Sequence, residues 1–296
     1  MQHVLSLVFI IRIVQSVIEL CGPHALVPVA NECLTALHAI FMKTAPCQTA
    51  DAMYGELPDD DDDHDGVMQA ACDLVGAICR VMGAHFAQYL PQFLPAICEY
   101  AKSSRPPSDR SMAVGCMSEI AQELEGAIAE HWQSVFLPCI LSGLADPEDT
   151  VRRNAAFCAG VCCEHLREQI TGDYQAILQQ LSPIFGLNVN EGSDATAACI
   201  DNAAAAVARM IMASPSHVPM SQVLPVLLRA LPLKTDMTEN ETVYTCLLGL
   251  LHMNQPDALA NASEIRRVFM EACSENSKVD DELKGKLHAA LQTLGQ

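Results

Sequence analysis

The chain has 296 residues, of which 50% are hydrophobic, 5% aromatic and 18% charged. This length and apolar content allow a sizeable core and exclude a chain that is disordered for most of its length. Seventeen lysines and arginines against 36 aspartates and glutamates give a net charge of −19. So acidic a surface repels phosphate backbones, which argues against a nucleic-acid binder and favours basic partners.

The N-terminal segment is apolar from Val4 to Val14, as in the core of a signal peptide. Arg12 interrupts this run, however, and the apolar positions continue at helical spacing through Leu20. We therefore expect a buried helix at 3–21 that belongs to a longer solenoid, with this chain as its C-terminal part. No uninterrupted apolar run reaches the roughly 20 residues of a membrane-spanning helix, so we expect no membrane insertion.

Short apolar phrases that contain a proline recur along the chain. Four of these prolines, Pro95, Pro138, Pro183 and Pro225, are separated by 43, 45 and 42 residues. A period of this length is typical of repeat arrays in which each unit is a pair of helices. We expect a leading helix at 3–21 and then helix pairs at 24–45 with 65–83, 86–102 with 107–124, 131–145 with 149–166, 173–187 with 194–213, 219–233 with 239–253, and 256–274 with 279–294.

An acidic segment interrupts the first of these pairs. Residues 46–65 hold eight acids, including the run Asp59, Asp60, Asp61, Asp62 and Asp63, and no lysine or arginine. Like charges this dense keep a segment extended and solvated, so one interpretation is a disordered spacer between the two helices. The other is a polyanion that attracts a basic ligand and is weakened by salt.

Fourteen cysteines are spread through apolar runs, in places where alanine or valine would also fit. Free cysteine behaves as a small buried hydrophobe, so this usage indicates a reducing compartment rather than a disulfide framework. The run Cys162, Cys163, Glu164 and His165 lacks a second cysteine or histidine pair at zinc-finger spacing, so we expect core cysteines and no metal. The sequence also holds no catalytic motif, and we expect neither a cofactor nor an enzyme.

Polar residues at equivalent positions of the second helices are candidates for binding. Asn154 and Asn202 lie 48 residues apart, near the starts of their helices. Their amides either grip the backbone of an extended ligand or bind the backbone of neighbouring loops within the solenoid. Glu119, Glu164 and Asp201 would add pairing for lysine or arginine side chains.

One repeat carries a more specific pattern. Pro138, Asp146 eight residues later, and the pair Val151-Arg152 at the start of the next helix resemble the HEAT repeat. The resemblance implies an all-α solenoid, a right-handed superhelix of about six antiparallel helix pairs plus the leading helix, forming a single array over 1–296. Such helix pairs bury their apolar faces only by stacking on their neighbours.

Longer phrases narrow the resemblance further. The segments Asp201–Pro215 (DNAAAAVARMIMASP) and Val223–Asp236 (VLPVLLRALPLKTD) are more specific than HEAT periodicity requires. Together with the acidic insert and Val151–His165 (VRRNAAFCAGVCCEH), they resemble the C-terminal part of a karyopherin-beta nuclear import receptor.

The karyopherin-beta resemblance implies a receptor that shuttles between cytoplasm and nucleus and carries basic cargo, such as histones H3 and H4 or ribosomal proteins. The GTPase Ran would release the cargo, mostly through repeats outside this chain. In this family the second helices line the inner surface, which implies cargo binding by Glu119, Asn154, Glu164, Asp201 and Asn202. The alternative is a HEAT scaffold or adaptor that mediates protein–protein contacts without transport, its acidity serving solubility.

Overall fold

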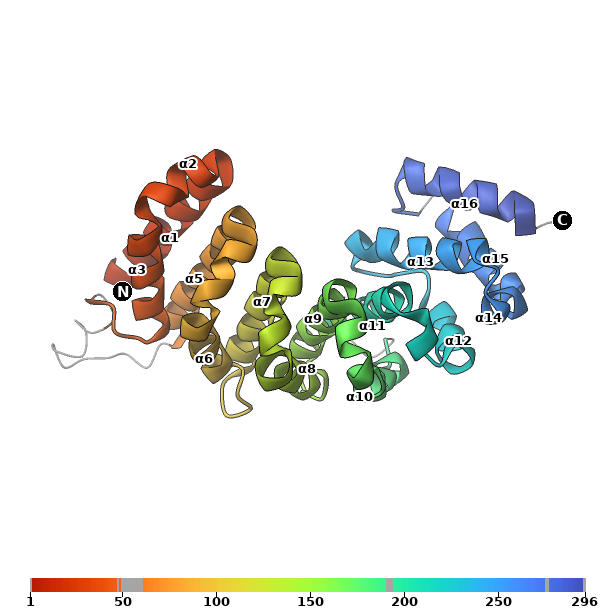
Figure 1. Ribbon diagram of the computed structural model, residues 1–296, viewed down its shortest axis with the longest axis horizontal. Helices are drawn as coiled ribbons and strands as arrows, with labels where there is room; N and C mark the ends of the chain where they lie inside the picture. The colour runs from red at the N-terminus through yellow and green to blue at the C-terminus, as the bar shows by residue number, and fades with distance from the viewer. Residues whose placement is uncertain (1, 47, 49–60, 190–193, 275–276, 295–296) are drawn as a thin grey trace. The chain divides into compact units, whose positions relative to one another are not determined.

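The computed structural model describes residues 2–46, 48, 61–189, 194–274 and 277–294, and all the regular structure in these ranges is helical (Figure 1). The chain divides into two compact units, Met1–Cys139 and Ile140–Gln296. Each unit repeats the same theme, in which a first helix, often opened by a 3-10 turn, is followed by a longer second helix. The second helices of neighbouring repeats within a unit pack against one another.

Unit 1 begins with the second-type helix α1, and its second helices α1, α5 and α7 stack in that order. Its described elements are α1 (Gln2–Cys21), α2 (Pro23–Leu26), η1 (Val27–Val29), α3 (Ala30–Phe41), α5 (Asp61–Met82), η2 (Gly83–Tyr89), α6 (Leu90–Tyr100), α7 (Pro107–Leu124), η3 (Glu125–His131) and the π-helical turn η4 (Trp132–Phe136). Helix α8 (Leu137–Leu144) crosses the boundary between the units.

In unit 2 the second helices α9, α11 and α13 pack side by side, and α16 follows on α13. The elements are α9 (Asp149–Leu166), η5 (Arg167–Asp173), α10 (Tyr174–Leu181), η6 (Ser182–Gly186), α11 (Asp194–Ala213), η7 (Pro215–His217), α12 (Met220–Ala230), η8 (Met237–Glu239), α13 (Asn240–His252), α14 (Pro256–Ala260), α15 (Ala262–Ala272) and α16 (Asp281–Leu294).

The predicted all-α helix-pair fold is confirmed, and the differences lie in the first helices and in the start of α5. The segment predicted as one helix at 24–45 is α2, η1 and α3, because Pro28 has no backbone N–H to continue an α-helix. Pro183 has the same effect where α10 passes into η6. Helix α5 begins at Asp61 and not at residue 65, so Asp61, Asp62 and Asp63 start a helix, whereas Asp59 and Asp60 lie outside the described residues.

A repeated backbone turn ends the second helices. Gly22, Gly83, Glu125 and Arg167 each have a positive φ, between 47° and 58°, directly after α1, α5, α7 and α9. The last three are 42 residues apart, so the turn recurs once per repeat. Glycine adopts this left-handed conformation without strain, whereas Glu125 and Arg167 carry a side chain there. The turn is therefore a property of the repeat and not of the local residue.

Small side chains form the seam between the second helices of unit 2. Ala155, Ala159, Ala203 and Ala206 are fully buried on α9 and α11. Gly160 lies so close to α11 that a Cβ atom added to it would stand 2.9 Å from the Ala206 Cα. The two helix backbones can approach this closely only because alanine, cysteine and glycine occupy the facing positions.

Two stretches, Gly66–Tyr100 and Asp194–Ala213, are apolar enough by composition to cross a membrane. In the structure, 61% and 78% of their most apolar windows are buried inside the protein. Burial of this kind is what the core helices of a helical array require. Their hydrophobicity is therefore accounted for by the packing of the repeats.

The seam gives a direct test of the packing. We expect Gly160→Ala to lower the free energy of unfolding by about 1–3 kcal/mol, since the new methyl group meets backbone that cannot move without separating α9 from α11. Gly249→Ala is the matched control, because nothing lies within 4 Å of a Cβ at this helical position of α13. It should be neutral or stabilise by about 0.5–1 kcal/mol. If urea unfolding shows the same change in the free energy of unfolding for the two substitutions, the close packing of α9 on α11 at Gly160 is contradicted.

Candidate functional site

The polar edge of the second helices in unit 1 centres on Glu119 of α7. This half-buried carboxyl lies against Gly76 of the neighbouring helix α5. A Cβ atom at position 76 would stand 1.7 Å from the Glu119 Oε2. Glycine at this position therefore makes the space in which the carboxyl sits.

Several charged side chains surround Glu119. Three acids and one guanidinium group from α1, α5 and α7 act on it: Glu19, Asp73, Glu123 and Arg80. Arg12 pairs with Asp73, and the Arg80 nitrogens lie 3.2 Å from Glu123 and 3.9 Å from Glu19. Within the described residues Glu119 itself takes part in no hydrogen bond or ion pair. The acids therefore outnumber the cations at this edge, and Glu119 is the carboxyl left over.

Its surroundings make Glu119 hard to ionise. Burial, followed by the charges of Asp73, Glu123 and Glu19, raises the pKa of Glu119 to about 7, and Arg80 opposes this increase. A group in this state gains more from an incoming cation than a solvated carboxylate does, because the cation supplies the missing counter-charge at a partly desolvated position. The geometry at Glu119 is thus suited to receiving a lysine or arginine side chain.

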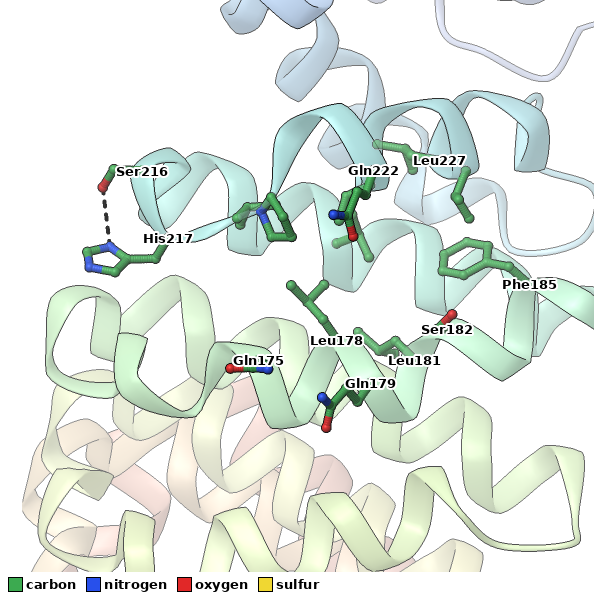
Figure 2. A pocket seen from close by; sticks show the side chains of 15 residues that line it. Gln175, Leu178, Gln179, Leu181, Ser182, Phe185, Ser216, His217, Gln222 and Leu227 are labelled. Atoms are coloured by element: carbon green, nitrogen blue, oxygen red, sulfur yellow. Dashed lines mark hydrogen bonds between the residues drawn. The ribbon is translucent and has the colours of Figure 1, made fainter.

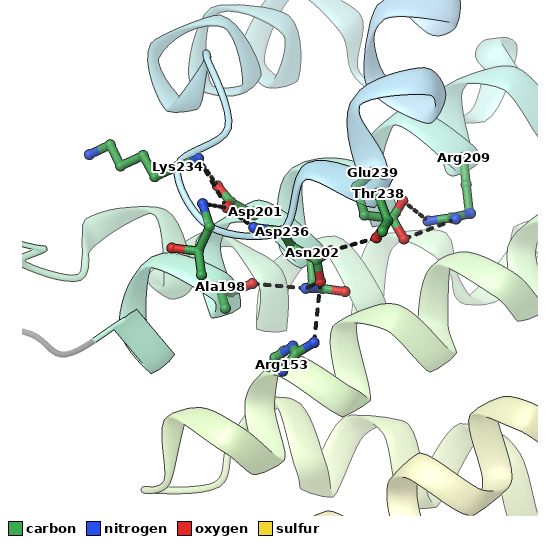
Figure 3. A network of polar contacts seen from close by, with 10 residues as sticks. Arg153, Ala198, Asp201, Asn202, Arg209, Lys234, Asp236, Thr238 and Glu239 are labelled. Carbon is green, nitrogen blue, oxygen red and sulfur yellow. Dashed lines mark hydrogen bonds and ion pairs between the residues drawn. The ribbon is translucent and has the colours of Figure 1, made fainter. Parts of the chain in front are cut away.

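In unit 2 the predicted residue Asp201 faces inward. Its side chain lies on α11 and is 1% exposed (Figure 3). The carboxylate accepts hydrogen bonds from the backbone N–H groups of Lys234 at 3.1 Å, Thr235 at 2.7 Å and Asp236 at 2.9 Å. Asp201 therefore anchors the loop between α12 and η8, and this loop occupies its acceptor sites. Cargo binding by Asp201 stays a prediction.

Asn202 anchors the same loop from the next position. It is 2% exposed and donates from Nδ2 to the Ala198 carbonyl and to the Asp236 Oδ2, both at 2.9 Å. The sequence left open whether this amide binds a ligand or the backbone of a neighbouring loop, and in the structure it binds a loop side chain and a carbonyl of its own helix. Its contact with cargo stays a prediction.

Asp236 links the loop to α9 as well as α11. Arg153 pairs with its carboxylate at 3.3 Å, and the Thr238 hydroxyl donates to it at 2.6 Å. Burial acts to raise the pKa of Asp236, but the hydrogen bonds from Thr238 and Asn202 and the charge of Arg153 outweigh it and lower that pKa. The lowered pKa means that this network stabilises the fold at neutral pH, and the stabilisation is lost as acid protonates Asp236.

Glu164 differs from these buried residues because its side chain is 48% exposed. It lies on α9 and accepts from the Arg209 Nε of α11 at 2.9 Å. Arg209 also pairs with the buried Glu239 at 2.8 Å and lies over the Phe157 ring. Glu164 therefore presents a partly neutralised carboxylate to solvent and, in addition, ties one repeat to the next.

The five predicted residues thus separate by position. Glu119 and Asn154 are half-buried and Glu164 is exposed, whereas Asp201 and Asn202 are closed off. Sequence reasoning missed Arg209, although a signal was present: Glu164 and Arg209 are 45 residues apart, one repeat period, and have opposite charge. In the part of the chain that the structure describes, no group of histidine, cysteine and acidic side chains could hold a metal ion.

Comparison with known proteins agrees with this architecture. A family model described as importin subunit beta-1-like, TPR repeats, matches residues 56–203. The chain belongs to the importin beta family. Mouse importin-4 is 32% identical over 284 residues, which are 95% of this chain and 25% of the mouse protein. The chain therefore spans about a quarter of the length of this curated family member.

Solved structures of importin beta proteins share the fold. A crystal structure of importin beta superimposes with a TM-score of 0.70 at 16% identity, over 95% of this chain and 32% of that protein. A crystal structure of Kap121p bound to RanGTP superimposes with a TM-score of 0.64 at 17% identity, over 86% and 23% of the two chains. These likenesses establish a helical-repeat solenoid for this family member.

The anchored loop allows a prediction about stability. Asp201→Ala should lower the free energy of unfolding by about 1–3 kcal/mol, because it leaves three part-buried backbone N–H groups without this acceptor. Asp201→Asn keeps one carbonyl oxygen and should cost less. Urea unfolding of the two variants beside Glu282→Gln, a change at an 80% exposed side chain, measures the difference. Wild-type stability of Asp201→Ala would mean that the loop is held by other contacts.

Proposed function

We propose that this chain is part of a nuclear import receptor that binds basic polypeptide cargo along its second helices. The observation that carries the proposal is the polar edge around Glu119, where carboxylates exceed guanidinium groups and one half-buried carboxyl has no ionic partner within the described residues. The net charge of −19 and the similarity to importin-4 support it. Neither feature calls for catalysis, so the proposed role is binding and not that of an enzyme.

The cargo class follows from charge. A basic tail, of the kind found in histones H3 and H4 and in ribosomal proteins, would be drawn to the acidic chain over a distance set by salt. Its lysine and arginine side chains would pair with Glu119 of unit 1 and with Glu164 of unit 2, each as a separate contact. Asn154 would bind the tail backbone. Ordering such a tail costs free energy, so several contacts are needed for useful affinity.

Two further parts of the proposal concern the acidic insert and release. Asp59, Asp60, Asp61, Asp62 and Asp63 would raise the local concentration of basic cargo without a fixed geometry. Release by Ran in its GTP form is proposed by analogy with Kap121p, whose structure bound to RanGTP has this fold. Loading in the cytoplasm and release in the nucleus would make the protein shuttle between the two compartments.

A non-transport HEAT scaffold remains the second candidate. The observation in its favour is that Asp201 and Asn202 bind the loop between α12 and η8. Two of the five predicted binding residues therefore serve the fold. A scaffold of this kind would keep the internal network yet have no preference for a basic tail. The two candidates therefore differ in peptide binding.

We expect a histidine-free basic peptide, rich in lysine and arginine like a histone tail, to bind the chain with an affinity that falls several-fold as salt rises from about 50 mM to about 300 mM. Glu119→Gln combined with Glu164→Gln should weaken binding by roughly 5- to 30-fold, since two charge-assisted contacts are lost. Affinity should also fall as the pH drops through about 7, because protonation removes the Glu119 charge. Fluorescence anisotropy measures all three.

The controls separate a local site from general attraction. Glu282→Gln changes one exposed acid on α16 and should leave binding unchanged. Substituting Asp59–Asp63 with asparagine should slow association and weaken binding, yet preserve the pH dependence that comes from Glu119. An absence of binding at low salt would favour the scaffold. Peptide affinity that is unaffected by Glu119→Gln and Glu164→Gln would contradict the proposed site.

A further inference from the structure

A groove lies between successive first helices of unit 2, apart from the row of second helices that carries the proposed cargo site. Its main hollow, of about 690 Å³, is bounded by α10 and η6 on one side and by η7 and α12 on the other. Figure 2 shows Gln175 and Gln179 of α10 across from Gln222 of α12, with Leu178 between them. The hollow thus combines an apolar floor with amide groups along both rims.

A second hollow of about 430 Å³ continues the first along α12. The two share Ser182, Phe185 and Val226, so they form one groove. The lining changes along its length, because the second hollow adds the side chains of Arg229 and Lys234. An apolar section is therefore followed by a section with two cations.

These two cations are available to a ligand. Arg229 and Lys234 are exposed, and neither side chain forms an ion pair within the described residues. The acid that also lines this section, Asp201, already accepts hydrogen bonds from three backbone N–H groups of the loop. One of those bonds fixes the backbone of Lys234 itself, while its side chain extends away from the network (Figure 3).

The positive charge of this section contrasts with the net charge of −19 of the whole chain. The field of the whole protein repels an acidic ligand, so any acidic segment that binds must do so through a local positive site. The glutamine amides on the rims each offer a donor and an acceptor, which suits the backbone of an extended peptide. The apolar floor would accept the side chains that such a peptide directs inward.

We propose that this groove binds an extended segment of a partner protein in which apolar side chains are followed by acidic residues. The apolar side chains lie over Leu178 and Val226, the backbone bonds to Gln179 and Gln222, and the carboxylates pair with Arg229 and Lys234. The ligand has the opposite charge to the proposed cargo and binds the other row of helices. The proposal for this groove therefore does not depend on the transport proposal, and each can be tested without the other.

The test uses two fluorescent synthetic peptides that share a Leu-x-x-Leu section and end in four glutamates or in four glutamines. We expect the glutamate peptide to bind at least about fivefold more tightly, by fluorescence anisotropy at low salt. Arg229→Glu with Lys234→Glu should weaken the glutamate peptide at least about tenfold, because two attractive contacts become repulsive. The same double change should leave the glutamine peptide within about twofold. Leu178→Asp should weaken both peptides.

The matched control is Arg266→Glu with Lys278→Glu, which makes the same change in net charge at two exposed residues outside the groove. Binding that is unchanged in this control and lost in the groove variant supports the proposal. Equal losses in the two double variants would mean that only overall charge matters. That result, or equal affinity of the wild type for the two peptides, would overturn the proposal.

Discussion

The close approach of the second helices is the constraint on which the other features depend. Glycine and alanine at the facing positions bring α9 and α11 into backbone contact at Gly160, and Gly76 has a related role in unit 1 by making room for Glu119 between α5 and α7. At this spacing a side chain on one helix reaches the next repeat. Arg209 can therefore bridge Glu164 and Glu239, and Arg80 can reach Glu123.

Polar residues on these helices serve two purposes, and burial decides between them. Asp201 and Asn202 are enclosed by the loop that follows α12, so their hydrogen-bonding capacity is used within the fold. Glu119 and Glu164 lie where no loop covers them completely, and their carboxylates retain capacity for a cation. Polar residues of the second helices can thus stabilise the solenoid at one position and be open to a ligand at another.

The sequence was sufficient to predict the order of the helices, because proline phrases at 43, 45 and 42 residues and apolar positions at helical spacing are local signals. It was not sufficient to predict that a ligand can reach Glu119 but not Asp201. Asp201 is buried by a loop 33 residues later in the chain. Glu119 experiences the negative charge of three acids, one each from α1, α5 and α7. Such contacts depend on how repeats stack, which spacing alone does not determine.

The groove between the first helices illustrates the same limit. Arg229 and Lys234 stand five residues apart and show no motif in the sequence, yet the hollow between η6 and α12 brings them together beside an apolar floor. A chain with a large negative charge thus combines an acidic edge on the second helices of unit 1 with a local positive site at the first helices of unit 2. Two sites of opposite charge would allow two ligands of different chemistry.

The ionisation of Glu119 in the presence of a basic peptide tests the central claim most directly. In the free chain, NMR titration of a carboxyl-labelled sample should give Glu119 a pKa of about 7. Bound peptide should lower that pKa towards the ordinary range of a glutamate, roughly 4.3, since a lysine or arginine would supply the missing counter-charge. A Glu119 pKa that is the same with and without saturating peptide would contradict the account.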